Sequence, residues 1–307
     1  MFHFHVLQFR ACLFFNIFLA VSLLMIVDVT AQQTGNPRDD LKGLSDDFDD
    51  GSTLKQWSRI YQTEQSHADQ LEKFDIAKTK PGWMVMVPYS STWYMDYRGV
   101  LVYKEVKGDF VVTSSIRVAR RDGDGAPRSN YSLAGLMIRT PRDVTPQTWK
   151  PGGENYIFLS LGAANRPGSF QFEVKTTVNS RSTLAVTDAG TPAAMIQIAR
   201  IGNDFILLKK TPEGTWNIHQ RYRRTDMPEQ LQVGLTVYTD YSTASRLKPP
   251  QQNNQVIRNG RPDLVAGFDY VHFQRPVVPA SFKGKSFSNQ AEVSDTQLLE
   301  FLGKHAQ

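Results

Sequence analysis

The acidic side chains in the middle of the chain are candidates for acid–base chemistry. Two carboxyl groups roughly 5–9 Å apart act as the acid and the base or nucleophile in glycoside hydrolysis, and acids two residues apart on a strand project from one face. No two acids have this spacing from residue 154 to residue 240, where the acids are Glu154, Glu173, Asp188, Asp204, Glu213, Asp226, Glu229 and Asp240. No catalytic pair is therefore predicted in this segment, and Glu173 is kept as the alternative, a single working acid or base.

A second set of side chains has the types that bind a sugar. Flat rings cover the apolar face of a pyranose, and charged or amide groups bond its hydroxyls. In residues 134–140 the apolar positions would face a core, which turns Arg139 outward, and the same alternation turns Tyr156, Glu173 and Lys175 outward. If their strands are neighbours, these side chains line one concave surface, on which Lys175 would favour an anionic sugar. The alternative for Arg139 and Glu173 is an ordinary cross-strand ion pair.

An aromatic-rich segment, residues 83–97, must contain a loop and adds rings to this surface. Trp93 and Tyr94 lie in it and would supply a stacking platform. The alternative for Trp93 is that it fills the core, as large aromatic side chains usually do. The predicted ligand-binding residues are therefore Arg139, Tyr156, Glu173, Lys175, Trp93 and Tyr94. On this interpretation, Arg139→Ala should abolish glycan binding and leave thermal unfolding nearly unchanged.

Period-two segments rich in β-branched and aromatic residues must position these side chains. The expected strands are bounded by Gly, Pro, Asn or Asp and comprise residues 83–87, 99–105, 110–118, 134–140, 156–161, 170–178, 195–200, 204–210, 216–223, 232–239 and 268–274. Almost no helix is indicated between them. The sequence therefore predicts an all-β fold, a two-sheet antiparallel β-sandwich of the jelly-roll kind. Residues 240–263 are expected to form a long surface loop.

The C-terminal tail departs from the strand pattern. Ser294 and Gln297 form a capping box, apolar residues follow on one face, and Gly303 stops the segment. This predicts a short C-terminal helix over residues 294–303. A helix of this length is marginal by itself in water, so we expect it to dock on the sandwich or on a protein partner.

The N-terminal segment differs from the rest because residues 11–27 are apolar apart from one Asn and one Ser. Arg10 precedes them and a small-residue site ends at Ala31, which predicts a signal peptide cleaved after Ala31 and a secreted or periplasmic protein. The apolar run approaches the ~17 residues that span a bilayer, so an uncleaved N-terminal anchor is the alternative. Cys12 is the only cysteine and lies in this segment, so the mature chain has no disulfide and no cysteine metal site.

The composition supports a folded domain, with 40% hydrophobic and 21% charged residues. The net charge of +5 does not change when residues 1–31 are removed, because they contain one base and one acid. The bases are dispersed except at residues 221–224, and such a short run is typical of a solvated strand face. No nucleic-acid partner is therefore expected.

Three stretches resemble the concanavalin A-like lectin/glucanase superfamily, especially the sandwich modules appended to β-xylosidases. Residues 44–51, followed by Leu54 and Trp57, are similar to its opening strand. Residues 107–112 with 134–139 resemble its central strands, and residues 268–273 resemble its closing strand. The resemblance implies a sandwich over residues 45–276, between a polar leader (32–44) and a tail (277–307), and it implies that the concave sheet recognises a glycan.

The same resemblance implies a structural calcium ion shared by the opening and closing strands. The matching ligand positions are Asp47 or Asp49 and Asp269, which would need backbone carbonyls and water to complete a shell of about 6–8 oxygens. The alternative is that these aspartates cap turns. The superfamily's glucanases carry Glu-x-Asp-x-x-Glu on one strand, and this chain lacks it. The resemblance therefore favours glycan binding, with a glycoside hydrolase or polysaccharide lyase of unfamiliar site as the alternative.

Overall fold

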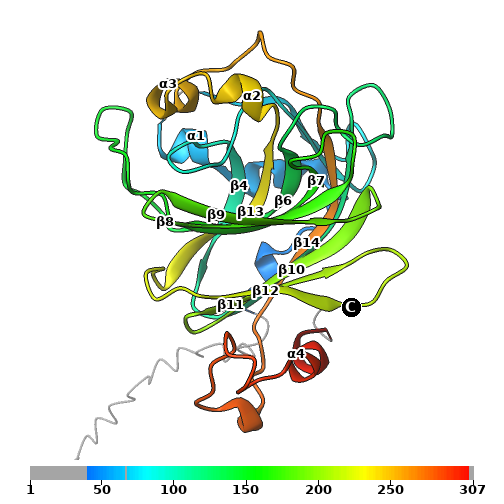
Figure 1. Ribbon diagram of the computed structural model, residues 1–307, viewed down its shortest axis with the longest axis vertical. Helices are drawn as coiled ribbons and strands as arrows, with labels where there is room; N and C mark the ends of the chain where they lie inside the picture. Colours follow the sequence, from blue (N-terminus) through cyan, green and yellow to red (C-terminus); the bar gives the residue numbers. More distant parts are fainter. Residues whose placement is uncertain (1–39, 66–67, 304–307) are drawn as a thin grey trace, which may run out of the picture. The chain divides into compact units, whose positions relative to one another are not determined.

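The computed structural model describes residues 40–65 and 68–303, and the fourteen strands in this part form two antiparallel sheets. The upper sheet in Figure 1 has the strand order β1 (Ser58–Arg59), β4 (Val100–Lys107), β13 (Gln230–Tyr238), β6 (Ser132–Arg139), β7 (Tyr156–Ala163), β8 (Gln171–Val178) and β9 (Arg181–Asp188). The lower sheet has the order β12 (Asn217–Arg223), β11 (Asp204–Lys210), β10 (Ala193–Ile201), β5 (Phe110–Ala119), β14 (Val265–Gln274), β3 (Met84–Pro88) and β2 (Leu71–Ile76). The predicted two-sheet β-sandwich is confirmed.

Every segment predicted as a strand contains one, and the three strands that the sequence pattern missed are all at sheet edges. β1 and β9 bound the upper sheet, and β2 bounds the lower sheet. β9 is exposed or half-buried along its whole length, and β2 is buried only at its two ends. Edge strands carry polar and charged side chains, and this weakens the apolar alternation on which the prediction depended.

The main hydrophobic core lies between the two sheets. Phe172 and Leu159 of the upper sheet pack in one cluster with Phe205 and Phe268 of the lower sheet, and none of the four is more than 1% exposed. This burial stabilises the sandwich by about 25 cal/mol for each Å² of apolar surface removed from water. The outer face of each sheet does not take part in this core and can be covered by other segments of the chain.

The C-terminal tail covers the outer face of the lower sheet. It contains the 3-10 helix η3 (Ala280–Phe282) and helix α4 (Asp295–Leu302), with the predicted capping box at Ser294 (Figure 1). The rings of Phe282, Phe287 and Phe301 contact one another at centroid distances of 5.7–6.3 Å. Leu298 and Leu302 of α4 are buried in the same cluster as Ile206 and Leu208 of β11. The apolar face of the helix is thus buried against its own sandwich, which is one of the two docking places expected from the sequence, and a protein partner stays a prediction.

Loops cover the outer face of the upper sheet. They carry three short helices, α1 (Ile60–Thr63), α2 (Tyr241–Ala244) and α3 (Pro249–Asn253), which lie above the sheet in Figure 1. The long loop expected over residues 240–263 therefore contains two short helices. Ile60 and Trp93 from the loops pack with Tyr156, Phe158 and Tyr238 from the sheet in a separate cluster.

The predicted signal peptide, residues 1–31, and the first part of the polar leader lie outside the described residues. The last part of the leader forms the 3-10 helix η1 (Lys42–Leu44). The helices of residues 40–65 and 68–303 are all too short or too polar to cross a membrane.

A histidine at the edge of the core gives a prediction about acid stability. His219 of β12 lies 5.9 Å from the ring of Phe172, and burial, with a smaller effect of Lys209, lowers the pKa of His219 to about 4. The pKa of His219 in the folded state is below the unfolded value of about 6.5. Burial of the neutral imidazole therefore does not lower the free energy of unfolding above pH 6.5, but this free energy falls as the pH drops from 6.5 to 4. The full shift corresponds to about 3 kcal/mol, and partial exposure reduces the expected loss to about 1–2 kcal/mol. Urea unfolding at pH 7 and pH 4.5 should show this loss in the wild type and not in His219→Phe, and equal losses in both would contradict the assignment.

Candidate functional site

The outer face of the upper sheet carries the side chains that the sequence predicted for binding. Arg139 of β6, Tyr156 of β7, and Glu173 and Lys175 of β8 all project away from the inter-sheet core, as the alternation predicted. The expectation that they line a surface open to water is wrong. The covering loops bury all four, and none is more than 1% exposed. Their role in ligand binding stays a prediction.

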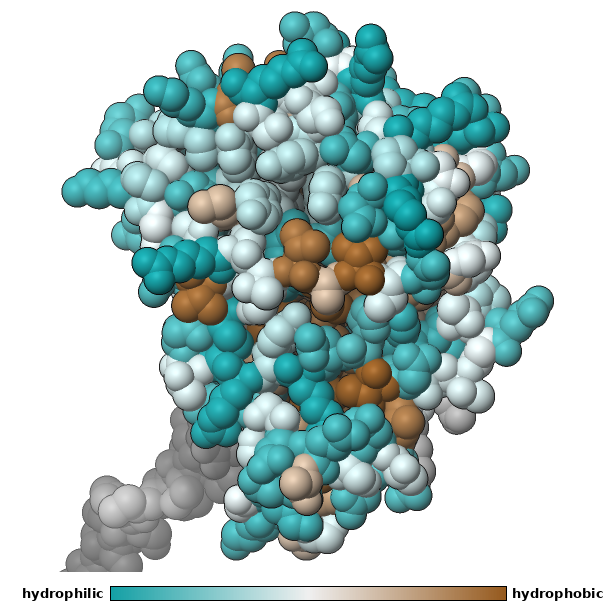
Figure 2. All heavy atoms as spheres, viewed as in Figure 1, coloured by the Kyte–Doolittle hydropathy of each residue, from teal (hydrophilic) through white to brown (hydrophobic). Residues whose placement is uncertain are grey.

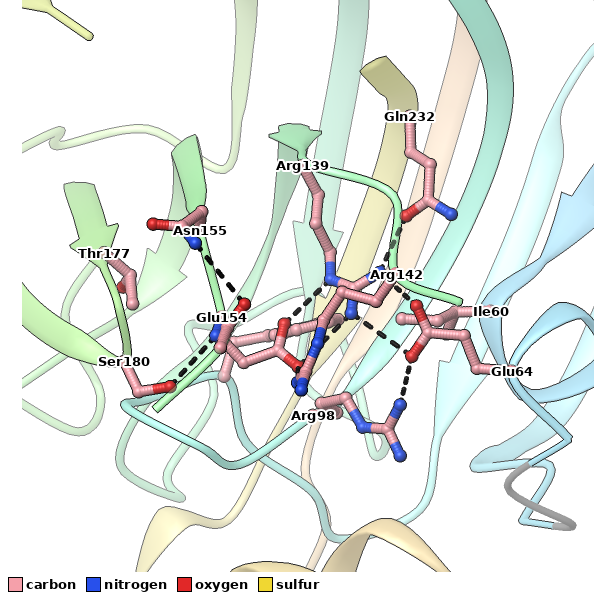
Figure 3. A network of polar contacts seen from close by, with 12 residues as sticks. Ile60, Glu64, Arg98, Arg139, Arg142, Glu154, Asn155, Thr177, Ser180 and Gln232 are labelled. Atoms are coloured by element: carbon pink, nitrogen blue, oxygen red, sulfur yellow. Dashed lines mark hydrogen bonds and ion pairs between the residues drawn. The ribbon is translucent and has the colours of Figure 1, made fainter. Parts of the chain in front are cut away.

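Arg139 is the centre of a buried ion network (Figure 3). Its Nε donates to Glu154 Oε2 at 2.9 Å, and its Nη1 donates to Glu64 Oε1 at 2.5 Å and to Gln232 Oε1 at 2.8 Å. Burial by itself would lower the pKa of Arg139, but the carboxylates of Glu154 and Glu64 outweigh it and raise this pKa above its ordinary value. The network joins β6 to the loop after α1 and leaves the guanidinium no free donor direction toward a ligand.

Two more arginines complete the network. Arg98 forms an ion pair with Glu64, and Arg142 Nη1 donates to Glu154 Oε1 at 2.6 Å. Burial lowers the pKa of Arg98, an effect that Glu64 opposes. The ion pair between Arg139 and Glu173 that the sequence offered as an alternative is not formed, because Arg139 pairs with Glu64 and Glu154.

Glu173 pairs instead with Lys175 on its own strand. Lys175 Nζ lies 3.0 Å from Glu173 Oε1 and donates to the carbonyl oxygen of Trp93 at 2.6 Å. The ammonium also lies 4.7 Å from the ring centroid of Phe158 and 5.4 Å from that of Tyr238. Burial raises the pKa of Glu173 and lowers that of Lys175, and each partner opposes the other's shift. The pair fixes the loop that contains Trp93 onto the sheet.

Trp93 is a packing residue, as the alternative interpretation had it. Its side chain is fully buried, its indole N–H donates to the carbonyl oxygen of Val100 at 3.0 Å, and its ring meets Tyr156 edge-on at 5.3 Å. The next residue, Tyr94, points elsewhere and lines a pocket above the sheet. Of the two predicted loop rings, only Tyr94 is therefore accessible from a cavity.

The pocket at Tyr94 has a volume of about 150 Å³. We call it the tyrosine pocket, and it is lined by Thr92, Tyr94, Tyr131, Lys175, Leu184 and Tyr241. Tyr241 meets Tyr94 edge-on at 6.2 Å and Tyr131 at 5.5 Å, so the three rings brace one another. Figure 2 shows that the surface seen in the view of Figure 1 is mostly hydrophilic, with small groups of apolar side chains across its middle.

Four residues of the tyrosine pocket were not predicted from the sequence. Tyr131 lies directly before β6, Tyr241 is the first residue of helix α2, and Leu184 is in the missed strand β9. Thr92 lies in the aromatic-rich segment, but the prediction selected only aromatic side chains there, and threonine has none. A signal for Tyr241 was present, because it begins the loop at residues 240–263 that was singled out for its length, but nothing local placed that loop over the upper sheet.

The predicted calcium ligands, Asp47, Asp49 and Asp269, belong to the opening and closing segments of the sandwich. The opening and closing segments do lie side by side, since Asp46 and Val271 bridge the two backbones. Asp47 Oδ1, however, is 2.6 Å from His272 Nε2. Neither Asp47, Asp49 and Asp269 nor any other group of three His, Cys, Asp or Glu within residues 40–65 and 68–303 is placed to hold a metal ion. A site made of two of these carboxylates with backbone carbonyls and water, which is what the resemblance implies, stays a prediction.

Comparison with known proteins gives a likeness of fold. No family model and no curated protein sequence matches the chain. Among solved structures, a xylan β-1,4-xylosidase from Bacillus halodurans is 14% identical with a TM-score of 0.49, over 75% of this chain and 39% of that one. Lectin II from Ulex europaeus is 12% identical with a TM-score of 0.40, over 67% of this chain and 90% of that one. A β-1,3-1,4-glucanase from a mouse hindgut metagenome is 12% identical with a TM-score of 0.41, over 76% of this chain and 98% of that one. These are the kinds of protein that the sequence resemblance named, and no residue's role is transferred from them.

Proposed function

We propose that the protein binds a glycan and that the tyrosine pocket receives one of its sugar rings. The observation that carries the proposal is that three tyrosines and Lys175 line one small cavity. Sugar sites combine aromatic faces, which cover the C–H side of a ring, with a few fixed polar groups that bond hydroxyls. Tyr94, Tyr131 and Tyr241 would supply the faces, and Lys175 and Thr92 would supply the polar groups.

The size and rigidity of the pocket suit a single sugar unit. Its volume of about 150 Å³ is below the roughly 300 Å³ at which pockets for drug-sized ligands begin. Lys175 is held by Glu173 and by the carbonyl oxygen of Trp93, so its place in the lining is fixed. A rigid site loses less conformational entropy on binding. Glu173 is then a positioning residue that acts through Lys175.

Removal of one ring tests the proposal. We expect Tyr241→Ala to weaken binding about ten- to thirtyfold, because a well-packed tyrosine in a small site carries a large share of the binding free energy. A glycan array identifies which glycan the wild type retains, and calorimetry with that glycan compares the variants. Since Tyr241 is half-buried at the start of a short helix, its loss should leave the sandwich folded, which circular dichroism checks.

The matched control is Tyr270→Ala. Tyr270 lies in β14 of the lower sheet and stacks on His272 at 4.3 Å. It therefore belongs to the other sheet and does not line the tyrosine pocket. Its loss should leave affinity unchanged. Wild-type affinity in Tyr241→Ala, or the same loss in both variants, would refute the site, and a wild type that retains no glycan would refute the function.

One observation favours a second candidate function, glycan cleavage. Burial raises the pKa of Glu173. A raised pKa favours the protonated carboxyl group, which is the form that a general acid needs near neutral pH. The tyrosine pocket is lined by Lys175 and not by Glu173, and for this reason binding is the proposal that we favour. New reducing ends or unsaturated products from the retained glycan, formed by the wild type and not by Glu173→Gln, would establish cleavage instead.

We also propose that the chain is exported, with cleavage after Ala31. The support is the apolar run at residues 11–27 and the small-residue site that follows it. A glycan-binding sandwich would meet polysaccharide outside the cytoplasm. The N-terminal sequence of the protein recovered from its host would begin at Gln32 on this proposal and at Met1 if the segment is an anchor.

A further inference from the structure

A second and larger cavity lies beside helix α2. It has a volume of about 470 Å³, within the roughly 300–1,000 Å³ of ligand pockets. We call it the arginine pocket, and it is lined by Asp240, Ser242, Thr243, Arg246, Leu247, Ile257, Asn259 and Arg261. Its lining combines hydroxyl, amide, guanidinium and carboxylate groups with the apolar side chains of Leu247 and Ile257, and such a mainly polar lining suits a polar, oxygen-rich ligand.

The backbone of the arginine pocket is held in place from several sides. Asp240 has a left-handed backbone (φ 64°) and its carboxylate accepts from Ser90 Oγ at 2.7 Å and from the backbone N–H of Arg261 at 2.6 Å. The carbonyl oxygen of Arg261 accepts from Ser129 Oγ. A Cβ atom added to Gly260 would lie 1.9 Å from Ser90 Oγ, so only glycine fits this close approach. A strained residue kept by surrounding contacts and a fixed loop are features of a preorganised site.

The two arginines of this pocket carry charge that the protein does not use internally. Arg246 and Arg261 are exposed residues. Neither guanidinium group forms an ion pair or a hydrogen bond with any residue that the structure describes. Nearby arginines behave differently, since Arg121 pairs with Glu72 and Arg128 pairs with Asp122. The one acid of the lining, Asp240, is occupied by the loop bonds. The pocket therefore presents two free guanidinium groups to a ligand.

The arginine pocket and the tyrosine pocket are neighbours along one chain segment. Tyr241 lines the tyrosine pocket, whereas Asp240, Ser242 and Thr243 line the arginine pocket. The two pockets therefore share helix α2 and its N-cap residue in their walls. Lys175 is neutralised by Glu173, so the positive charge that faces a ligand comes from Arg246 and Arg261.

We propose that the arginine pocket binds the anionic groups of an acidic glycan, whose carboxylate or sulfate oxygens bond Arg246 and Arg261 while a neighbouring ring enters the tyrosine pocket. This inference rests on the proposed glycan binding and specifies its substrate class. Guanidinium groups form paired, charge-assisted hydrogen bonds to planar oxyanions. The hydroxyls of Ser242 and Thr243 and the amide of Asn259 supply the donors and acceptors that sugar hydroxyls need.

The experiment compares charged and uncharged forms of the same polysaccharide. The immobilised probes are polygalacturonate and its fully methyl-esterified form, alginate, chondroitin sulfate, and the neutral dextran, laminarin and cellohexaose. The variants are Arg246→Gln/Arg261→Gln and the control Arg258→Gln, which removes the same kind of charge from the same loop. Arg258 is exposed, contacts Tyr89 Oη at 2.9 Å and does not line the arginine pocket.

We expect the wild type to retain acidic probes and to lose affinity as salt rises. Each arginine that bonds an anion should contribute about tenfold, so the double variant should lose about a hundredfold, and Arg258→Gln should lose less than about twofold. Retention of neutral probes alone, equal retention of the acid and its ester, or equal losses in the double variant and Arg258→Gln would each overturn the inference. Retention of no probe by the wild type would instead overturn the proposed glycan binding, and the acidic class with it.

Discussion

Arg139→Met should lower the free energy of unfolding by about 3–5 kcal/mol, the usual cost of removing one partner from a buried ion pair. Arg139 is fully buried and bonds Glu64, Glu154 and Gln232. Without it, two buried carboxylates face each other with only Arg98 and Arg142 as partners. Urea unfolding followed by tryptophan fluorescence measures the loss as a lower midpoint at an unchanged slope.

Arg166→Met is the matched control. Arg166 forms an ion pair with Asp188 in which the two side chains are 55% and 71% exposed, and such surface pairs contribute about 0–1 kcal/mol. A loss below about 1 kcal/mol in Arg139→Met would show that the network is not a stabilising feature. The prediction reverses the one made from the sequence, in which an exposed Arg139 could be replaced by alanine with nearly unchanged unfolding.

The second large effect is expected from Lys175→Met, which should also lose about 3–5 kcal/mol at pH 8, because Glu173 is left as an unpaired charge in an apolar site. The loss should depend on pH. Burial raises the pKa of Glu173 in the folded state, so the carboxyl is neutral in both states below the unfolded pKa of about 4.3. The penalty then grows as the pH rises above the unfolded pKa and levels off once the pH passes the folded pKa. Unfolding at pH 5 and pH 8 should therefore give a smaller loss at pH 5.

The double variant Lys175→Met/Glu173→Gln separates charge from packing. It removes the unpaired carboxylate, so it should recover most of the stability lost in Lys175→Met at pH 8, with a coupling free energy that a double-mutant cycle measures. A double variant as unstable as the single one would show that the contacts of the Lys175 stem, rather than its charge, hold this part of the face together.

The loops that cover the outer face of the upper sheet are held there by long-range contacts, which a local sequence pattern does not reveal. Gln252 Nε2 donates to the carbonyl oxygen of Arg98 at 2.9 Å, and Arg98 N–H donates to Asn253 Oδ1 at 2.8 Å, across more than 150 residues of chain. Such contacts hold helix α3 and the loop at residues 95–98 over the sheet. A sequence interpretation that lacks them leaves Arg139 in water, although every inference about its strand and its direction is right.

Strand alternation by itself determined the sandwich, eleven of the fourteen described strands, and the face from which Arg139, Tyr156, Glu173 and Lys175 project. This was possible because a side chain's face depends only on the two-residue period of its own strand. Only the tertiary structure decided that this face is covered, which charges pair on it, and that the accessible rings are Tyr94, Tyr131 and Tyr241. Loops have no period, and their positions are set by hydrogen bonds and packing with residues that are distant in sequence.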